Sequence, residues 1–171
     1  MKAKIVWFTG LSGSGKTTLS KKLQKILKEK KYKVLAIDGD KFRKKNKSEN
    51  AFTKTNIVKN NIRIIKYINK IFKKYNFIIV SVISPFLKTR KIAKKKFNKN
   101  YFEVFVKCKI STLKRRDTKG LYKLADEKKI KNLIGYKSKI KYEKSNYNKV
   151  SIDTDNLNIN SSIQKIIRNL I

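Results

Sequence analysis

The sequence predicts an α/β protein whose parallel five-stranded sheet is covered by helices on both faces. Short apolar runs alternate along the chain with longer segments in which apolar residues recur every three or four positions. Strands that alternate with helices form right-handed crossovers, which place parallel strands in one sheet between two helical layers. In such sheets the functional site lies at the carboxyl ends of the strands.

Each expected element follows from its own pattern. The strands are short apolar runs rich in branched residues, expected at residues 4–9, 33–37, 77–83, 101–106 and 149–152. The helices are amphipathic segments, expected at residues 16–30, 56–75, 89–97 and 162–170. The first helix shows the pattern clearly, because Leu19, Leu23 and Leu27 fall on one face. The aromatic residues on predicted strands are expected in the core: Trp7, Phe8, Phe77 and Phe105.

Two segments, residues 41–56 and 126–148, are polar and poorly patterned, so we expect long loops there. Loops of that length in a compact domain are usually lids or binding segments, or are disordered. The chain shows no internal repeat and no linker rich in Gly, Ser or Pro. Its 171 residues are therefore expected to form a single domain, residues 1–171.

The composition excludes several classes of site. Without any His, the chain has no His base and no His-ligated metal, and its one Cys, Cys108, excludes an internal disulfide or a multi-Cys zinc site. The 46 Lys and Arg against 11 Asp and Glu give a net charge of +35, a field that attracts anions. Because the lysines are spread over nearly every segment, a solvated surface is favoured over a specific nucleic-acid site. No apolar run is long enough to span a membrane, and we expect a cytoplasmic protein.

The segment between the first predicted strand and the first predicted helix matches the phosphate-binding pattern G-x-x-x-x-G-K-[ST]. It consists of Gly10, Leu11, Ser12, Gly13, Ser14, Gly15, Lys16 and Thr17. Glycines let backbone N–H groups turn toward phosphate oxygens, and the following helix adds its positive end. Lys16 is expected to reach the β- and γ-phosphates, and the Thr17 hydroxyl to bind Mg²⁺. The motif predicts a P-loop NTPase fold and a nucleoside triphosphate site, in which we also place Thr18.

Two carboxylates, Asp38 and Asp40, follow the second predicted strand and so lie at the edge of the sheet that carries the phosphate loop. A carboxylate there can hold a magnesium-bound water or accept a proton from an attacking hydroxyl. The alternative for Asp38 is an Asx turn or a helix cap. Asp40 and Arg43 are either capping residues or are spaced to reach a second substrate.

Together with further segments, these residues resemble the adenylylsulfate kinase (APS kinase) family. The similar segments, besides the phosphate loop, are residues 38–43, 61–63, 83–86 and 102–106. The most specific is residues 116–123, Arg-Asp-Thr-Lys-Gly-Leu-Tyr-Lys, followed by Ala125 and then by Ile-Lys-Asn at 130–132. This stretch is similar to the lid of that family and places the lid at about residues 111–145.

The resemblance implies that ATP phosphorylates the 3′-hydroxyl of adenosine 5′-phosphosulfate, giving PAPS and ADP in sulfate assimilation, with Mg²⁺ as cofactor. Lys16 and Asp38 would be catalytic, and Ser84 occupies the position that the family describes as a phosphoserine. Arg116 would lie near the ATP, and a homodimer is implied. By the family's pattern, the residues that would contact the phosphosulfate substrate are Asp40, Arg43, Phe52, Asn61, Ile83, Lys119 and Leu121.

The sequence also departs from the family's pattern. Ile57 and Val58 stand where the family has an Asp-Arg pair, Thr118 replaces the lid proline, and Leu133 replaces a Phe that forms one wall of an adenine site. Lysines elsewhere do not reproduce a bidentate arginine. Two alternatives therefore stay open: another small-molecule P-loop kinase, or a basic nucleotide-binding protein that has lost catalysis.

Overall fold

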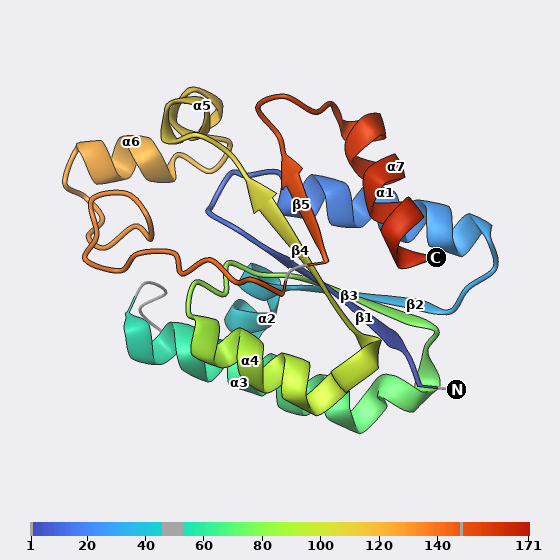
Figure 1. The fold of residues 1–171 in the computed structure, drawn as a ribbon. Coiled ribbons are helices and arrows are strands. Elements are labelled where there is room, and N and C mark those ends of the chain that lie inside the picture. Colours follow the sequence, from blue (N-terminus) through green and yellow to red (C-terminus); the bar gives the residue numbers. More distant parts are fainter. Residues whose placement is uncertain (1, 46–52, 148) are drawn as a thin grey trace.

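The computed structural model of the chain describes residues 2–45, 53–147 and 149–171. Within these residues, five strands form one parallel sheet in the order β2-β3-β1-β4-β5. The strands are β1 (Lys4–Thr9), β2 (Val34–Asp38), β3 (Phe77–Ser81), β4 (Tyr101–Lys107) and β5 (Val150–Asp153). The predicted α/β class with a five-stranded parallel sheet is confirmed (Figure 1).

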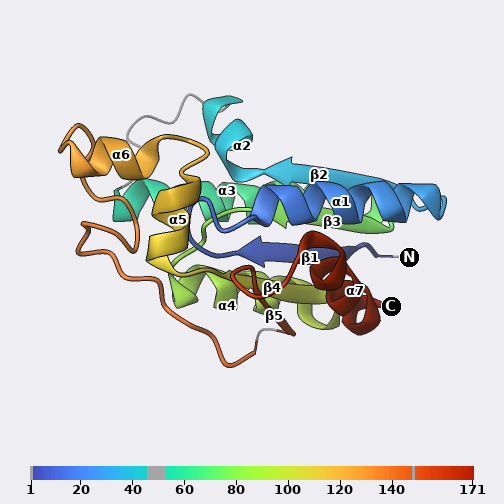
Figure 2. The same cartoon turned by 90° about the horizontal axis from the view of Figure 1, so that it is seen from above.

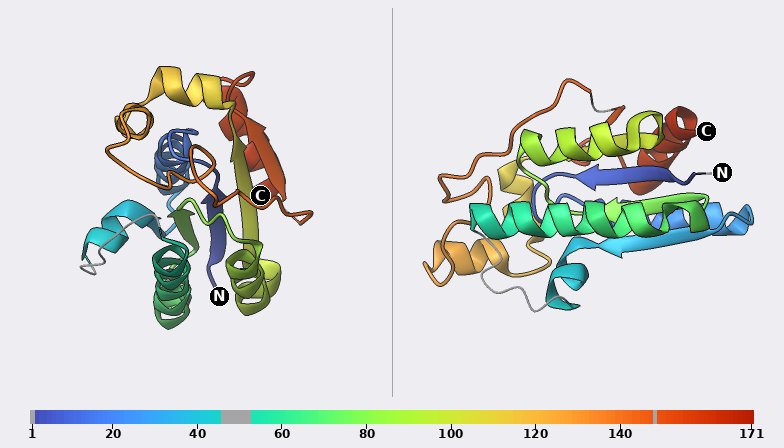
Figure 3. Two further views of the ribbon diagram at one scale, coloured as in Figure 1. Left: turned by 90° about the vertical axis from the view of Figure 1, so that its left-hand side faces the viewer. Right: turned by 90° about the horizontal axis from the view of Figure 1, so that it is seen from below.

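Helices cover both faces of this sheet. They are α1 (Lys16–Glu29), α2 (Gly39–Lys45), α3 (Lys54–Ile71), α4 (Leu87–Phe97), α5 (Ile110–Arg116), α6 (Leu121–Asp126) and α7 (Ile159–Leu170). Helices α1 and α7 lie on one face, and α3 and α4 lie on the other (Figure 3). Short 3₁₀ helices follow α3 and α4, at Phe72–Lys74 and Asn98–Asn100.

The alternation of side chains along β1 explains the two layers. Val6 and Phe8 are fully buried in the cluster that β1 shares with α1 and α7, whereas Ile5 and Trp7 are fully buried in the cluster with α3 and α4. Successive strand residues point to opposite faces, so a strand buried on both sides reads as a continuous apolar run. Phe77 is buried as predicted. The prediction for Phe105 is wrong: it is only partly buried.

Several boundaries differ from the predictions, and three of the differences have a cause in the local structure. The strand expected to reach residue 83 ends at Ser81, before Ser84 adopts a φ of +42°. Helix α3 starts earlier than expected because the Thr53 hydroxyl caps it, accepting the Asn56 N–H at 3.2 Å. The segment expected to be a loop from residue 41 contains most of α2, a short polar helix with no apolar periodicity to predict it.

The segment predicted as a lid lies beyond the carboxyl ends of the strands. Helices α5 and α6 lie at that end of the molecule in both views of Figures 1 and 2, on the side opposite the two chain termini. After α6, the described residues up to 147 contain no helix or strand, which agrees with the predicted long loop. No helix among the described residues is long and apolar enough to cross a membrane.

Candidate active site

The phosphate-binding loop connects β1 to α1 through backbone conformations that favour glycine. Gly10 has a φ of +144°, and a Cβ there would lie 2.3 Å from the carbonyl oxygen of Val106 on β4. Gly15 has a φ of +96° at the N-cap of α1. These two residues let the loop pass close to the sheet edge and enter the helix directly, so that the N-terminus of α1 faces the site.

A cleft of about 1070 Å³ opens above the carboxyl ends of the strands. Its walls come from the phosphate loop, the end of β2, the segment between α5 and α6, and the loop after β5. The predicted site residues that line it are Ser12, Gly13, Gly15, Lys16, Thr17, Thr18, Asp38, Asp40, Ile83, Arg116 and Lys119. Gly10, Leu11 and Ser14 of the loop are not among its lining residues.

Lys16 reaches into this cleft from the first turn of α1 while its side chain is almost fully buried. Its Nζ donates a hydrogen bond to the carbonyl oxygen of Leu11 at 2.6 Å. Burial and, to a smaller extent, the charge of Lys119 lower the pKa of Lys16 to about 7, against the opposing effect of Asp40 and Asp38. A buried ammonium with one neutral partner binds an anion strongly, because the anion supplies the missing countercharge.

The two oxygens of the Asp38 carboxylate have different partners. Oδ1 accepts the backbone N–H groups of Asp40 and Lys41 at 3.0 and 3.1 Å, which makes Asp38 the cap of α2. Oδ2 accepts the Thr17 hydroxyl hydrogen at 3.3 Å and lies at the wall of the cleft. Asp38 is therefore a helix cap, as one of the two interpretations expected, and it also lines the cleft.

Asp40 joins two cations at the mouth of the cleft. It forms ion pairs with Arg43, one turn along α2, and with Lys119, whose Nζ lies 2.5 Å from Oδ2. Burial acts to raise the pKa of the Asp40 carboxyl, but the hydrogen bond and charge of Lys119 and the charge of Arg43 hold it below its usual value. Asp40 is thus an anion that keeps two cationic side chains beside the cleft.

A second, much smaller pocket of about 20 Å³ adjoins the cleft. It is lined by Gly39, Asp40, Arg43, Ile57, Asn60, Asn61, Val82, Ile83, Ser84 and Ile134. Asn61 is fully buried, and neither its Oδ1 nor its Nδ2 has a hydrogen-bond partner within the described parts of the chain. The Oδ1 of Asn60, which the sequence analysis missed, is likewise unpaired. Unpaired buried amide groups cost about 1–3 kcal/mol each, so they are typical of sites that a ligand completes.

Several predicted residues lie elsewhere. Phe52 is outside the described residues. Leu121 and Leu133 line neither cavity and instead pack in the apolar cluster of the lid. Leu133 therefore leaves no gap in the wall of the site, and its neighbour Ile134 faces the small pocket. Where the family pattern has an arginine, Val58 packs among apolar side chains.

At the far end of the cleft, the predicted Arg116 lies beside three residues that sequence reasoning missed, Thr154, Asn158 and Asn160. Exposed Arg116, at the end of α5, donates to the Thr154 carbonyl at 2.7 Å and to its hydroxyl at 3.2 Å. The Thr154 hydroxyl donates to the carbonyl of Ser14 at 3.2 Å, so it joins the lid to the phosphate loop. Asn158 and Asn160 line the same end. Their only signal in the sequence is that they follow the last strand, at the functional edge of the sheet.

The site combines a glycine-rich phosphate loop, a buried lysine and a carboxylate at the end of β2. This combination, beside helices α5 and α6, defines a P-loop kinase. A family model described as adenylylsulphate kinase matches residues 2–153 of the chain. The chain belongs to the adenylylsulphate kinase family of phosphotransferases.

Individual relatives agree with this assignment. The chain is 38% identical to an adenylyl-sulfate kinase of Clostridium acetobutylicum over 154 residues, which are 90% of this chain and 76% of the relative. It is 36% identical to a probable adenylyl-sulfate kinase of Pyrococcus abyssi over 98% of this chain and 95% of that relative. The Mycobacterium tuberculosis APS kinase in complex with AMPPNP and APS superposes with a TM-score of 0.87 at 27% identity, over 99% of this chain and 98% of that one.

Proposed function

We propose that this enzyme transfers the γ-phosphoryl group of ATP to the 3′-hydroxyl of adenosine 5′-phosphosulfate, giving PAPS and ADP in sulfate assimilation. The observation that carries the proposal is the contact between the two cavities: Asp40 and Ile83 line both the large cleft and the small polar pocket. The small pocket has room for about one small polar group. An acceptor that lies over it with one such group inside would meet a nucleotide on the phosphate loop at this shared wall. Phosphoryl transfer needs such juxtaposition of donor and acceptor.

Lys16, Thr17 and Asp38 serve the donor side of this reaction. The charge of Lys16 stabilises the β- and γ-phosphates as negative charge moves during transfer. Asp38 orients the acceptor hydroxyl or takes its proton, and its bonds to the start of α2 hold the carboxylate in place. Arg116, Thr18 and the other lining residues of the phosphate loop hold the nucleotide.

The residues present fit Mg²⁺. The Thr17 hydroxyl and the Asp38 carboxylate offer hard oxygen donors 3.3 Å apart on the cleft wall. The described residues contain no group of three metal-ligating side chains, and Mg²⁺ bound with a nucleotide usually needs only one or two from the protein. When bound, Mg²⁺ would neutralise phosphate charge and orient the γ-phosphate.

The acceptor side is assigned to the small pocket and its rim. Arg43 and Lys119 offer cations to the phosphosulfate, and Asn61 offers unpaired hydrogen-bonding groups. Ile83 forms the apolar wall, and Phe52 and Leu121 remain assigned to the substrate by the family pattern. Ser84 is a loop residue of this pocket rather than a phosphoryl carrier, because its side chain is fully buried beside Thr89. Direct in-line transfer needs no such carrier.

We further infer that residues 1–171 act as one kinase domain with a lid at about residues 111–145. The enzyme is proposed to be a cytoplasmic homodimer without a specific nucleic-acid partner. These assignments are supported by the resemblance to the family and by the even spread of the lysines along the chain.

The proposed function is tested by incubating the protein with Mg²⁺, ATP and adenylyl sulfate and separating PAPS from ADP by chromatography. Other hydroxyl acceptors are assayed in parallel, and Lys16→Ala is the control for contaminating kinases. Formation of PAPS by the wild type alone supports the proposal. ADP formed only with another acceptor would instead identify a sister kinase, an outcome that the apolar surroundings of Val58 make worth testing. Nucleotide binding without any acceptor-dependent ADP would indicate that catalysis has been lost.

A further inference from the structure

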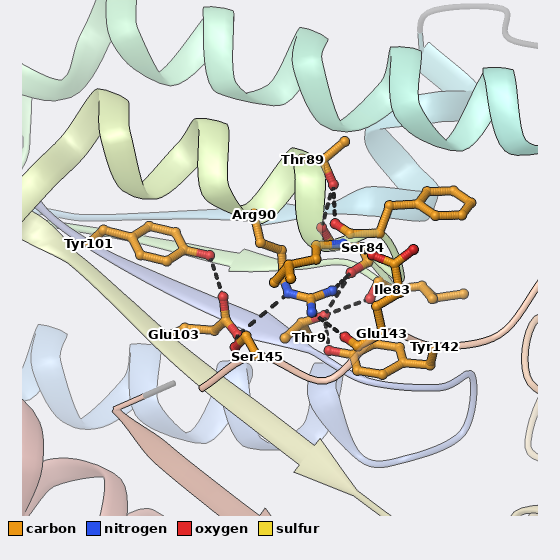
Figure 4. Close-up of polar contacts among 12 residues, drawn as sticks. Thr9, Ile83, Ser84, Thr89, Arg90, Tyr101, Glu103, Tyr142, Glu143 and Ser145 are labelled. Atoms are coloured by element: carbon orange, nitrogen blue, oxygen red, sulfur yellow. Dashed lines mark hydrogen bonds and ion pairs between the residues drawn. The ribbon is translucent and has the colours of Figure 1, made fainter. Parts of the chain in front are cut away.

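Arg90, on α4, is fully buried although it carries a permanent charge. Figure 4 shows its guanidinium surrounded by polar groups from several segments. Nη1 donates to the carbonyl oxygen of Ser84 and Nη2 to the carbonyl oxygen of Glu143. The guanidinium also lies over the ring of Tyr142, at 5.0 Å from its centre. A buried charge is retained only where its partners are well placed, so the arrangement is specific.

The countercharge of Arg90 comes from β4. Glu103 is 1% exposed, and its Oε1 lies 3.5 Å from the Arg90 Nε. Besides this ion pair, Glu103 accepts hydrogen bonds from the Tyr101 hydroxyl at 2.9 Å and from the Ser145 hydroxyl at 2.6 Å. Each carboxylate oxygen therefore has a hydroxyl donor, and the ion pair is anchored to the sheet.

Arg90 connects two segments that are far apart in the sequence. One is the loop after β3 that contains Ser84; the other is residues 142–145, which we call the strap. The strap makes two more bonds to the loop region: its Glu143 N–H donates to the Pro85 carbonyl at 2.9 Å, and its Glu143 carboxylate accepts the Leu87 N–H at 2.5 Å. The strap is thus bonded directly to the loop and to the start of α4, in addition to its bond with Arg90.

A second connection joins the strap to the phosphate-loop side of the sheet. The hydroxyls of Tyr142 and Thr9, the last residue of β1, lie 2.8 Å apart. Thr9 also donates to the carbonyl of Ile83 at 2.6 Å. Val82, Ile83 and Ser84 are the residues through which this loop lines the small pocket. The network around Arg90 therefore lies directly behind the wall of the pocket assigned to the acceptor.

The backbone of the loop gives a reason for this support. Ser84 has a φ of +42°, a conformation that is unfavourable for a residue with a side chain. Such a conformation persists only where surrounding contacts hold it. The bond from Arg90 to the Ser84 carbonyl acts on this residue directly.

We propose that Arg90 is a positioning residue for the acceptor pocket, which acts by holding the Ser84 loop against the strap. Arg90 touches neither cavity, so its effect on substrate is indirect. The inference rests on the proposed function, since it takes the small pocket as the acceptor site.

The test compares the Michaelis constants for the two substrates in three variants. Arg90→Lys keeps the charge but loses the planar fork that reaches two carbonyls at once. Glu143→Ala and Tyr142→Phe remove strap bonds at positions that are exposed or partly exposed, so these variants are expected to fold even if Arg90→Lys does not. The control is Lys144→Ala, an exposed neighbour in the strap.

We expect the KM for adenylyl sulfate to rise about tenfold in Glu143→Ala and in Arg90→Lys, and less in Tyr142→Phe, while the KM for ATP changes less than about twofold. The double variant of Arg90→Lys and Glu143→Ala should be less than additive, because both weaken the same connection between strap and loop, one at the Glu143 carbonyl and the other at the Glu143 carboxylate. Unchanged KM for adenylyl sulfate in folded Glu143→Ala and Tyr142→Phe would overturn the inference, as would equal increases for both substrates. A wild type that does not use adenylyl sulfate would overturn the proposed function itself.

Discussion

Lys119 and Asp40 form an ion pair of 2.5 Å that connects the segment between α5 and α6 to the start of α2 across the mouth of the cleft. Both side chains are about half exposed. An exposed pair contributes little to folding, so its position over the cleft points to substrate binding rather than stability.

Replacing Lys119 with Met is therefore expected to lower the free energy of unfolding by less than about 1 kcal/mol. The same substitution should reduce turnover of adenylyl sulfate at least tenfold, because the substrate loses a charged contact. Thermal unfolding and steady-state kinetics measure the two effects. The matched control is Lys129→Met, which removes a comparably exposed ion pair with Glu127 in the same region. Equal activity in the two variants would contradict the assignment of Lys119.

The two oxygens of the Asp38 carboxylate have different partners, so substitutions can separate its role as a helix cap from its proposed role in catalysis. Asp38→Asn keeps an oxygen to cap α2 but loses the negative charge, so we expect stability near that of the wild type and turnover reduced about 10²-fold or more. Asp38→Ala also loses the cap, which costs about another 1 kcal/mol of stability. Activity near the wild-type value in Asp38→Asn would show that the carboxylate is only a cap.

The pKa of about 7 for Lys16 predicts proton uptake when nucleotide binds. Above pH 7 the free enzyme holds a mostly neutral Lys16, whereas bound phosphates favour the ammonium, so binding at pH 8 should take up about one proton and binding at pH 6 almost none. Calorimetry in buffers of different ionisation enthalpy measures this number. The Lys16→Met variant should show no uptake, and a wild type without uptake at pH 8 would refute the prediction.

The same pKa shift affects stability. Since Lys16 binds its proton less tightly in the folded chain than in the unfolded chain, its contribution to the free energy of unfolding increases as the pH rises from about 7 toward 10.5, the ordinary pKa of a lysine. Lys16→Met should remove this part of the pH dependence in chemical unfolding. The slope that remains in the variant then belongs to other groups.

We expect Asn61 to lower the stability of the folded chain and to improve the binding of adenylyl sulfate. Asn61→Leu replaces a buried amide without partners among the described residues by an apolar side chain of similar size, so it should raise the free energy of unfolding by about 1–2 kcal/mol. Loss of the amide should also raise the KM for adenylyl sulfate about tenfold. Asn69→Leu, on the exposed face of α3, is the control for a general effect of Leu on this helix. A more stable variant with unchanged KM would remove Asn61 from the site.

The net charge of +35 predicts a salt-dependent stability. Repulsion between the many lysines destabilises the folded chain, and added salt screens it. The melting temperature should therefore rise with NaCl concentration, and rise more with phosphate, which also binds the cleft. A melting temperature that stays flat or falls with ionic strength would contradict this.

The phosphate loop, the strands and the main helices of this protein were predictable because each depends on the residues of one short segment. The phosphate loop depends on glycines and a lysine at set spacing, and the strands and main helices depend on apolar periodicity, so both were found without a structure. Helix α2 was missed because its residues are polar and its cap, Asp38, is indistinguishable in sequence from a catalytic carboxylate.

Tertiary structure decided how distant segments complete the site. Arg90 gives no signal on a lysine-rich helix, yet folding buries it between Ser84 and Glu143, the latter 53 positions away. Likewise Leu133, expected at an adenine wall, belongs to the lid's apolar cluster, and Ile134 faces the pocket. Periodicity and motifs report interactions within a segment, whereas burial and pairing of a side chain depend on which other segments the packed sheet brings to it.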